Sequence, residues 1–151
     1  MNLKEPEVLA AGMLTMAVCL VLHAVFMFLV FRAQIVFRDR FPQATGFTLV
    51  VPTILIATVF MVVSSILQII IWFGVLHLFG SFPSAQDALY FSGTTYTTLG
   101  TGKHVLVAPY RVLEPLEAMN GTLASGLNTA VLFAILANLA RKHSTLGEFF
   151  R

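Results

Sequence analysis

The sequence predicts an all-α membrane protein with three transmembrane helices, a short re-entrant helix and an irregular loop. Of the 151 residues, 58% are hydrophobic and 11% are charged, whereas soluble domains carry about a quarter charged residues. Three apolar runs are long enough to cross a hydrocarbon core of about 30 Å. A polar stretch containing two glycines separates the last two runs. Irregular backbone at membrane depth must be buried in protein or line a wet cavity.

Residues 9–31 form the first predicted span, since they are almost wholly apolar. His23 is a polar exception, and packing against a neighbouring helix is preferred to a role as a proton carrier. Three arginines between residues 32 and 40 mark a membrane–water boundary. We therefore assign residues 1–47 to an N-terminal transmembrane helix and a cytoplasmic connection.

Residues 48–79 form the second predicted span, which is longer than one crossing needs and can tilt or protrude. Ser64 and Ser65 are small and suit a helix interface or a bond back to the backbone. Trp72 lies toward the far end, where an interfacial anchor is expected.

A short helix is predicted at residues 83–95, because Ser81 or Ser84 can cap it and Pro83 suits its first turn. At 1.5 Å per residue it is roughly 20 Å long, too short to span a bilayer. Its C-terminal end carries a partial negative charge and favours a cation inside the membrane. The irregular loop at residues 98–102 follows directly.

Residues 115–140 form the third predicted span, which contains many small and polar residues suited to helix contacts or a wet lumen. Residues 141–151 form a tail. Five residues recur at three- and four-residue steps and are predicted to line a cavity on one helix face: Thr122, Ser125, Thr129, Phe133 and Ala137. Phe133 is either a hydrophobic gate or ordinary packing between helices, and the two interpretations are weighted equally.

The distribution of basic residues predicts the orientation in the bilayer. Six lie on the side of the first connection and the tail, and three lie on the other side. An excess of Lys and Arg marks the cytoplasmic side, so we expect the C-terminus inside and the N-terminus outside. The net charge of +2 gives no reason to expect a nucleic-acid partner.

From residue 48 to residue 140 the order of elements resembles the pore module of the tetrameric potassium-channel superfamily. It is most similar to short bacterial channels with one extra N-terminal helix. Three segments carry the resemblance: Thr98-Leu99-Gly100-Thr101-Gly102, similar to the Thr-Val-Gly-Tyr-Gly selectivity filter; Ala88-Leu89-Tyr90-Phe91-Ser92, similar to the pore helix; and Arg111 to Gly121, similar to the start of the inner helix.

The resemblance implies a homotetramer in a bacterial inner membrane, with potassium or another monovalent cation as permeant ion and no cofactor. Backbone carbonyls of Thr98, Leu99, Gly100 and Thr101, with the Thr98 hydroxyl, would replace the ion's hydration shell. Gly100 and Gly102 would permit the backbone twist. Gly121 falls at the family's hinge position, and Gly126 at a second small position.

Two departures from the family affect the outer mouth. Thr101 replaces a tyrosine that holds the filter at one width, and Lys103 replaces an aspartate that attracts cations. Ion pairing of Lys103 with Glu114, Glu117 or Asp87 is the preferred interpretation. Glu117, assigned with Lys103 and His104 to the outer mouth, is either functional or paired with the pore loop, and pairing is preferred. His104 is a pH-sensitive mouth residue or a solvated loop histidine.

The predicted function is a tetrameric cation channel that conducts potassium through this filter, and the two departures predict either weakened selectivity or a small conductance. The alternative is a non-conducting membrane subunit or scaffold that keeps the pore fold. An enzyme is not expected, because the sequence contains no nucleophile–base arrangement, no nucleotide motif and no Cys/His metal spacing.

Overall fold

The computed structural model describes residues 4–44, 47–79, 82–100 and 105–142. This part of the chain is helical and contains no strand. Its elements are α1 (Glu5–Arg40), α2 (Phe47–Phe79), α3 (Ala85–Tyr96), the short 3-10 helix η1 (Tyr110–Val112) and α4 (Leu113–Lys142).

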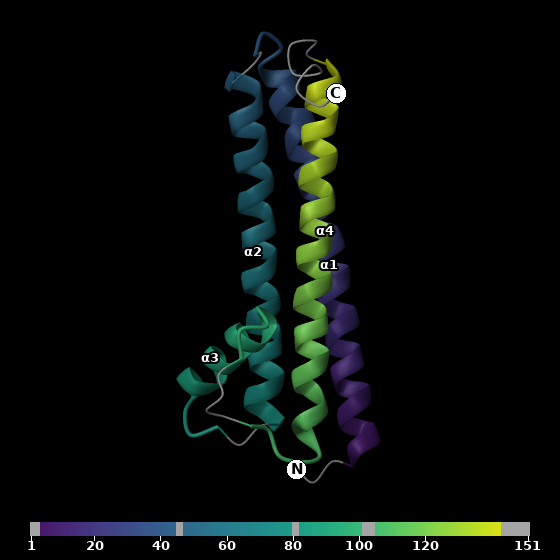
Figure 1. Ribbon diagram of the computed structural model, residues 1–151, viewed down its shortest axis with the longest axis vertical. Coiled ribbons are helices and arrows are strands. Elements are labelled where there is room, and N and C mark those ends of the chain that lie inside the picture. The colour runs from purple at the N-terminus through teal and green to yellow at the C-terminus, as the bar shows by residue number, and fades with distance from the viewer. Residues whose placement is uncertain (1–3, 45–46, 80–81, 101–104, 143–151) are drawn as a thin grey trace.

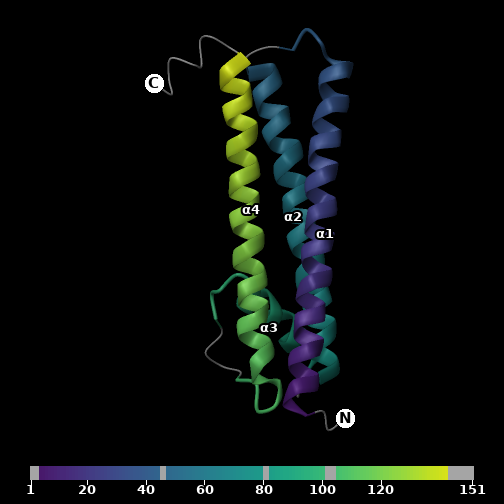
Figure 2. The ribbon, with the colours of Figure 1, turned by 90° about the vertical axis from the view of Figure 1, so that its right-hand side faces the viewer.

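Three helices are long and apolar enough to span a membrane: Glu5–Arg40, Phe47–Phe79 and Tyr110–Leu139. They run side by side along the long axis of the molecule (Figures 1 and 2). The predicted all-α architecture with three spans is confirmed, and the chain is a multi-pass membrane protein. Helical hydrogen bonding continues past the apolar residues, so α1 is longer at both ends than the predicted run 9–31.

The short helix α3 lies at the same end of the bundle as the N-terminus (Figure 1). The connection from α1 to α2 and the end of α4 lie at the opposite end. Helix α3 contacts both α2 and α4. Helix α3 therefore lies between two spans at one end of a three-helix bundle.

Local capping determines where α3 begins. Ser84 is its N-cap: its Oγ accepts a hydrogen bond from the Asp87 backbone N–H (3.1 Å) and donates to Asp87 Oδ2 (2.7 Å). Asp87 also places a negative charge in the first turn, where the helix dipole is positive. The helix observed at Ala85–Tyr96 thus starts two residues after the predicted residue 83.

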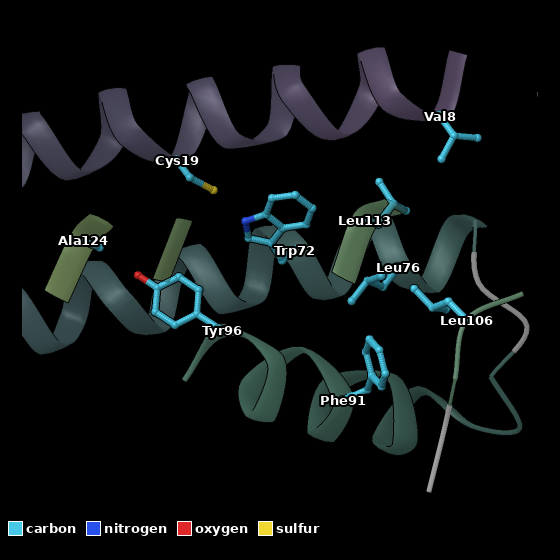
Figure 3. Packing of buried hydrophobic residues seen from close by; sticks show 9 residues of the cluster. All are labelled: Val8, Cys19, Trp72, Leu76, Phe91, Tyr96, Leu106, Leu113 and Ala124. Carbon is cyan, nitrogen blue, oxygen red and sulfur yellow. The ribbon is translucent and has the colours of Figure 1, made fainter. Parts of the chain in front are cut away.

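A buried apolar cluster joins all four α-helices near α3 (Figure 3). Trp72 of α2 is fully buried in it, beneath α1, whose Cys19 belongs to the same cluster. The expectation that Trp72 is an interfacial anchor is therefore wrong, because α1 covers the face of α2 on which it lies. A second cluster between α1, α2 and α4 contains Val30, Met61 and Ile135.

Candidate functional site

The loop after α3 folds back onto the end of that helix. The Thr98 backbone N–H donates to the Thr95 carbonyl (2.9 Å), and the Leu99 and Gly100 N–H groups both donate to the Thr94 carbonyl (2.8 and 3.1 Å). The last carbonyls of a helix have no partner inside the helix. These three bonds satisfy two of them, the carbonyls of Thr94 and Thr95, and hold the loop against α3.

The same hydrogen bonds determine where the loop carbonyls point. In a planar trans peptide the C=O group and the following N–H group point in opposite directions. Because the Leu99 and Gly100 N–H groups are directed at Thr94, the carbonyls of Thr98 and Leu99 both point away from α3. Two successive carbonyls therefore face the same way, on residues whose side chains are exposed.

This arrangement needs unusual backbone conformations. Thr98 has φ +59° and Gly100 has φ +71°, whereas Leu99 between them is not in the left-handed region. Glycine adopts positive φ without cost, but a β-branched residue in this region stores about 1–3 kcal/mol of strain. The surroundings hold Thr98 in this conformation, and such strain concentrates at functional sites. Thr101, Gly102, Lys103 and His104 lie outside the described residues.

Glu117 of α4 lies behind α3, inside the subunit. Its side chain is 0% exposed, and Oε1 accepts a hydrogen bond of 2.5 Å from the Ser92 hydroxyl of α3. The Ser92 Oγ also lies 2.9 Å from the Ile69 carbonyl of α2. This contact agrees with the preferred interpretation of Glu117, pairing with the segment that leads into the loop, because the side chain joins α4 to α3.

Gly121 brings α4 into direct contact with the last residue of α3. A Cβ atom at this position would lie 1.9 Å from the Tyr96 carbonyl oxygen. Any side chain larger than hydrogen would collide with the backbone that leads into the loop. Position 121 therefore requires glycine so that α4 can approach α3 closely. This requirement is independent of any role of Gly121 as a hinge of α4. Gly126 has open space around it.

A protein-family model described as "Ion channel" matches residues 54–138, more than half of the chain. The chain belongs to this ion-channel family. The matched region runs from α2 through α3 into α4, so α1 lies outside it. The family is one of channels and not of enzymes. Searches of curated proteins and of solved structures gave no match.

The inner helix of this ion channel has two distinct faces. Ala124, Val131 and Ile135 are buried against the rest of the subunit. On the other face Phe133 is 69% exposed, and the Thr122 and Thr129 hydroxyls donate to backbone carbonyls four residues earlier. Four of the five residues predicted to line a cavity are exposed in the subunit: Thr122, Ser125, Thr129 and Phe133. The fifth, Ala137, is half-buried.

A buried polar cluster in the channel was only partly anticipated. His23 Nδ1 lies 3.1 Å from Ser64 Oγ and 3.2 Å from Gln68 Nε2. Asn120 Nδ2 donates to Gln68 Oε1 (2.8 Å). His23 thus packs against a neighbouring helix, the preferred interpretation. Ser92 and Asn120 belong to segments that carry the family resemblance, but no polar contact is predicted for them. Gln68 is not predicted at all, although a lone amide within the apolar run 61–76 is the signal that points to it.

Proposed function

We propose that four copies of this chain surround a central pore that conducts potassium. The carbonyls of Thr98, Leu99, Gly100 and Thr101, with the Thr98 hydroxyl, coordinate the ion, and Gly102 completes the filter. The observation that carries this proposal is the common direction of the Thr98 and Leu99 carbonyls, away from α3. Carbonyl oxygens arranged in rings replace the hydration shell of a dehydrated ion.

The geometry of one subunit supports the proposed tetramer. One loop supplies only one wall of a pore, and closed cyclic symmetry supplies the others from identical chains. The C-terminal end of α3 lies next to the proposed coordination site, and its partial negative charge favours a cation there. Membership of the ion-channel family supports a cation channel in a lipid bilayer; the tetramer and the preference for potassium are our proposal.

The exposed face of α4 lines the cavity below the filter. Hydroxyls of Thr122, Ser125 and Thr129 give this face a polar character that suits water better than lipid. Phe133 is the largest exposed side chain on it and narrows the cavity near the other end. Gly121 and Gly126 are the proposed hinge positions.

We place the end that carries α3 and the N-terminus outside a bacterial inner membrane. Arg38 and Arg40 end α1 at the opposite end of the bundle, where α4 also ends (Figure 1). An excess of basic residues marks this end as cytoplasmic. The filter then opens to the outside, and Lys103 and His104 belong to its mouth.

Thr101 and Lys103 weaken the preference for potassium in this proposal. Threonine is too short to brace the filter against the pore helix. Four lysines around the mouth no longer attract cations as four aspartates would, and they repel cations wherever no carboxylate pairs with them. Restoring the family residues with Thr101→Tyr and Lys103→Asp should increase the permeability ratio of potassium to sodium. An unchanged ratio in the double variant would show that these two positions do not set selectivity.

The deciding experiment reconstitutes the purified chain in liposomes under opposed potassium and sodium gradients. Reversal near the potassium equilibrium potential supports the filter proposed above. Reversal near zero, with both ions permeant, keeps the cation pore but rejects potassium selectivity. Absence of current from reconstituted tetramers favours the alternative function, a non-conducting subunit, and a second measurement then asks whether the variant with the restored family residues conducts.

A further inference from the structure

Polar side chains buried within the three-helix bundle form a continuous connection from α1 to α4. His23, Ser64, Gln68 and Asn120 are each at most 1% exposed. His23 on α1 contacts Ser64 and Gln68 on α2, and Gln68 receives a hydrogen bond from Asn120 on α4. Each of the three spanning helices therefore contributes to one hydrogen-bonded cluster, which we call the interhelical cluster.

The interhelical cluster ends next to the backbone that leads into the filter. Asn120 immediately precedes Gly121, whose Cα lies against the Tyr96 carbonyl. One turn earlier, Glu117 accepts the hydrogen bond from Ser92. The turn of α4 held by Gln68 is therefore the turn that contacts α3 at two points. Tyr96 is two residues before Thr98, the first residue of the proposed filter.

Packing alone does not require these residue types. Leucine and methionine fill an intramembrane helix interface at no electrostatic cost, whereas buried polar groups in a membrane are expensive unless they are paired. Hydrogen bonds also fix the rotation of one helix about its axis relative to another, which apolar contacts do less strictly. The cluster thus determines which face of α4 meets α3.

We propose that His23 and Gln68 are positioning residues for the filter, and that α1 acts on ion selection through them. His23 holds the Gln68 side chain, Gln68 holds Asn120, and Asn120 sets the position of Gly121 against Tyr96. The inference rests on the proposed function, because it assigns the filter to residues 98–102. It assigns to α1, the helix that the family match does not cover, a role in positioning the filter.

The test compares variants that break the cluster with matched controls. His23→Leu and Gln68→Met remove the hydrogen bonds and keep similar volumes. His23→Asn keeps a polar atom near the position of Nδ1 and should restore the contact. Thr15→Val is the matched control, since Thr15 is a buried polar residue of α1 whose hydroxyl donates only to the Ala11 carbonyl of its own helix among the bonds described.

Two readouts separate this inference from the proposed function. The first is the reversal potential of reconstituted channels, which we expect to move toward zero in His23→Leu and Gln68→Met and to stay at the wild-type value in His23→Asn and Thr15→Val. The second is hydrogen–deuterium exchange of peptides covering residues 94–100, measured on tetramers in lipid nanodiscs without ion flow. Loss of one buried hydrogen bond should speed exchange there about fivefold in the two disruptive variants.

The outcomes are distinct. If the wild-type chain passes no ions, the proposed function fails, and exchange at residues 94–100 still decides whether α1 positions that segment. If the disruptive variants assemble and keep both the wild-type reversal potential and the wild-type exchange rate, the cluster has no influence on the filter and the inference is overturned. Equal effects of Thr15→Val and His23→Leu would also overturn it.

Discussion

Gly121 of α4 and the carbonyl of Tyr96, the last residue of α3, are in direct contact, because a Cβ at Gly121 would lie 1.9 Å from that oxygen. Two helices separated by a loop in the sequence therefore meet two residues before the proposed filter begins at Thr98. The contact links the position of the inner helix to the backbone of the loop.

Gly121→Ala should destabilise the subunit by about 1–3 kcal/mol, because the added methyl group forces α4 away from α3. Gly126→Ala is the matched control: nothing lies within 4 Å of its added carbon, and alanine is favoured over glycine in a helix by up to about 1 kcal/mol. Thermal unfolding of the purified protein in detergent measures the stability of both variants. Equal stability of the two variants would contradict the close contact.

Ser92→Ala should lower the free energy of unfolding by about 1–3 kcal/mol, since it leaves the buried Glu117 oxygen without its hydrogen bond. The double variant Ser92→Ala with Glu117→Met should cost less than the sum of the two single changes, because both polar groups are then absent. A double-mutant cycle measures this coupling. Additive costs would show that the Ser92–Glu117 contact contributes no coupling energy.

Gly100→Ala should impair conduction through backbone conformation and not through crowding, because no atom lies within 4 Å of the added carbon while φ is +71°. An L-residue in this region costs roughly 1–2 kcal/mol. A semisynthetic channel with D-alanine at position 100 should conduct like the wild type, since a D-residue favours positive φ. Single-channel recordings compare the two forms. Equal impairment by both enantiomers would mean that the side chain itself is not tolerated.

Ser84→Ala should loosen the first turn of α3, because it removes the side-chain acceptor of the Asp87 N–H. Loss of such a cap costs about 1 kcal/mol. Amide exchange of residues 85–88 should therefore accelerate, with Gln86→Ala, an exposed change in the same turn, as the control. If both variants exchange at the same rate, the cap does not stabilise α3.

Phe133→Ala should raise the open probability if the exposed aromatic ring constricts the cavity. The ring is 69% exposed in the subunit, so it is available to a lumen or to a neighbouring inner helix. Leu136→Ala removes a less exposed apolar side chain of the same helix and is the control. A lower yield of tetramers with unchanged openings would instead assign Phe133 to packing between inner helices.

Hydropathy and local turn chemistry sufficed to predict the three spans and the short helix, because length and apolar content decide whether a segment crosses a bilayer. The positive φ of Gly100 could be expected from the residue type. The positive φ of Thr98 could not, since threonine disfavours that region and the hydrogen bonds of the loop to α3 form only in the folded chain.

The side-chain partners inside the bundle could not be predicted from this sequence. Contacts between intramembrane polar groups depend on the rotation and the tilt of each helix. A hydropathy pattern determines neither the rotation nor the tilt. Gln68 and Asn120 are therefore joined only in the structure. Trp72 was misplaced for the same reason, since no pattern showed that α1 packs over it.

The position of α1 has a consequence for the modularity of this channel. The family match begins within α2, so the pore looks like a separable unit that could be excised from the chain. Without α1, however, Trp72 and Gln68 would face acyl chains, and Gln68 would lose its contact with His23. A minimal version of this channel should therefore keep α1 or replace the residues of α2 that α1 covers.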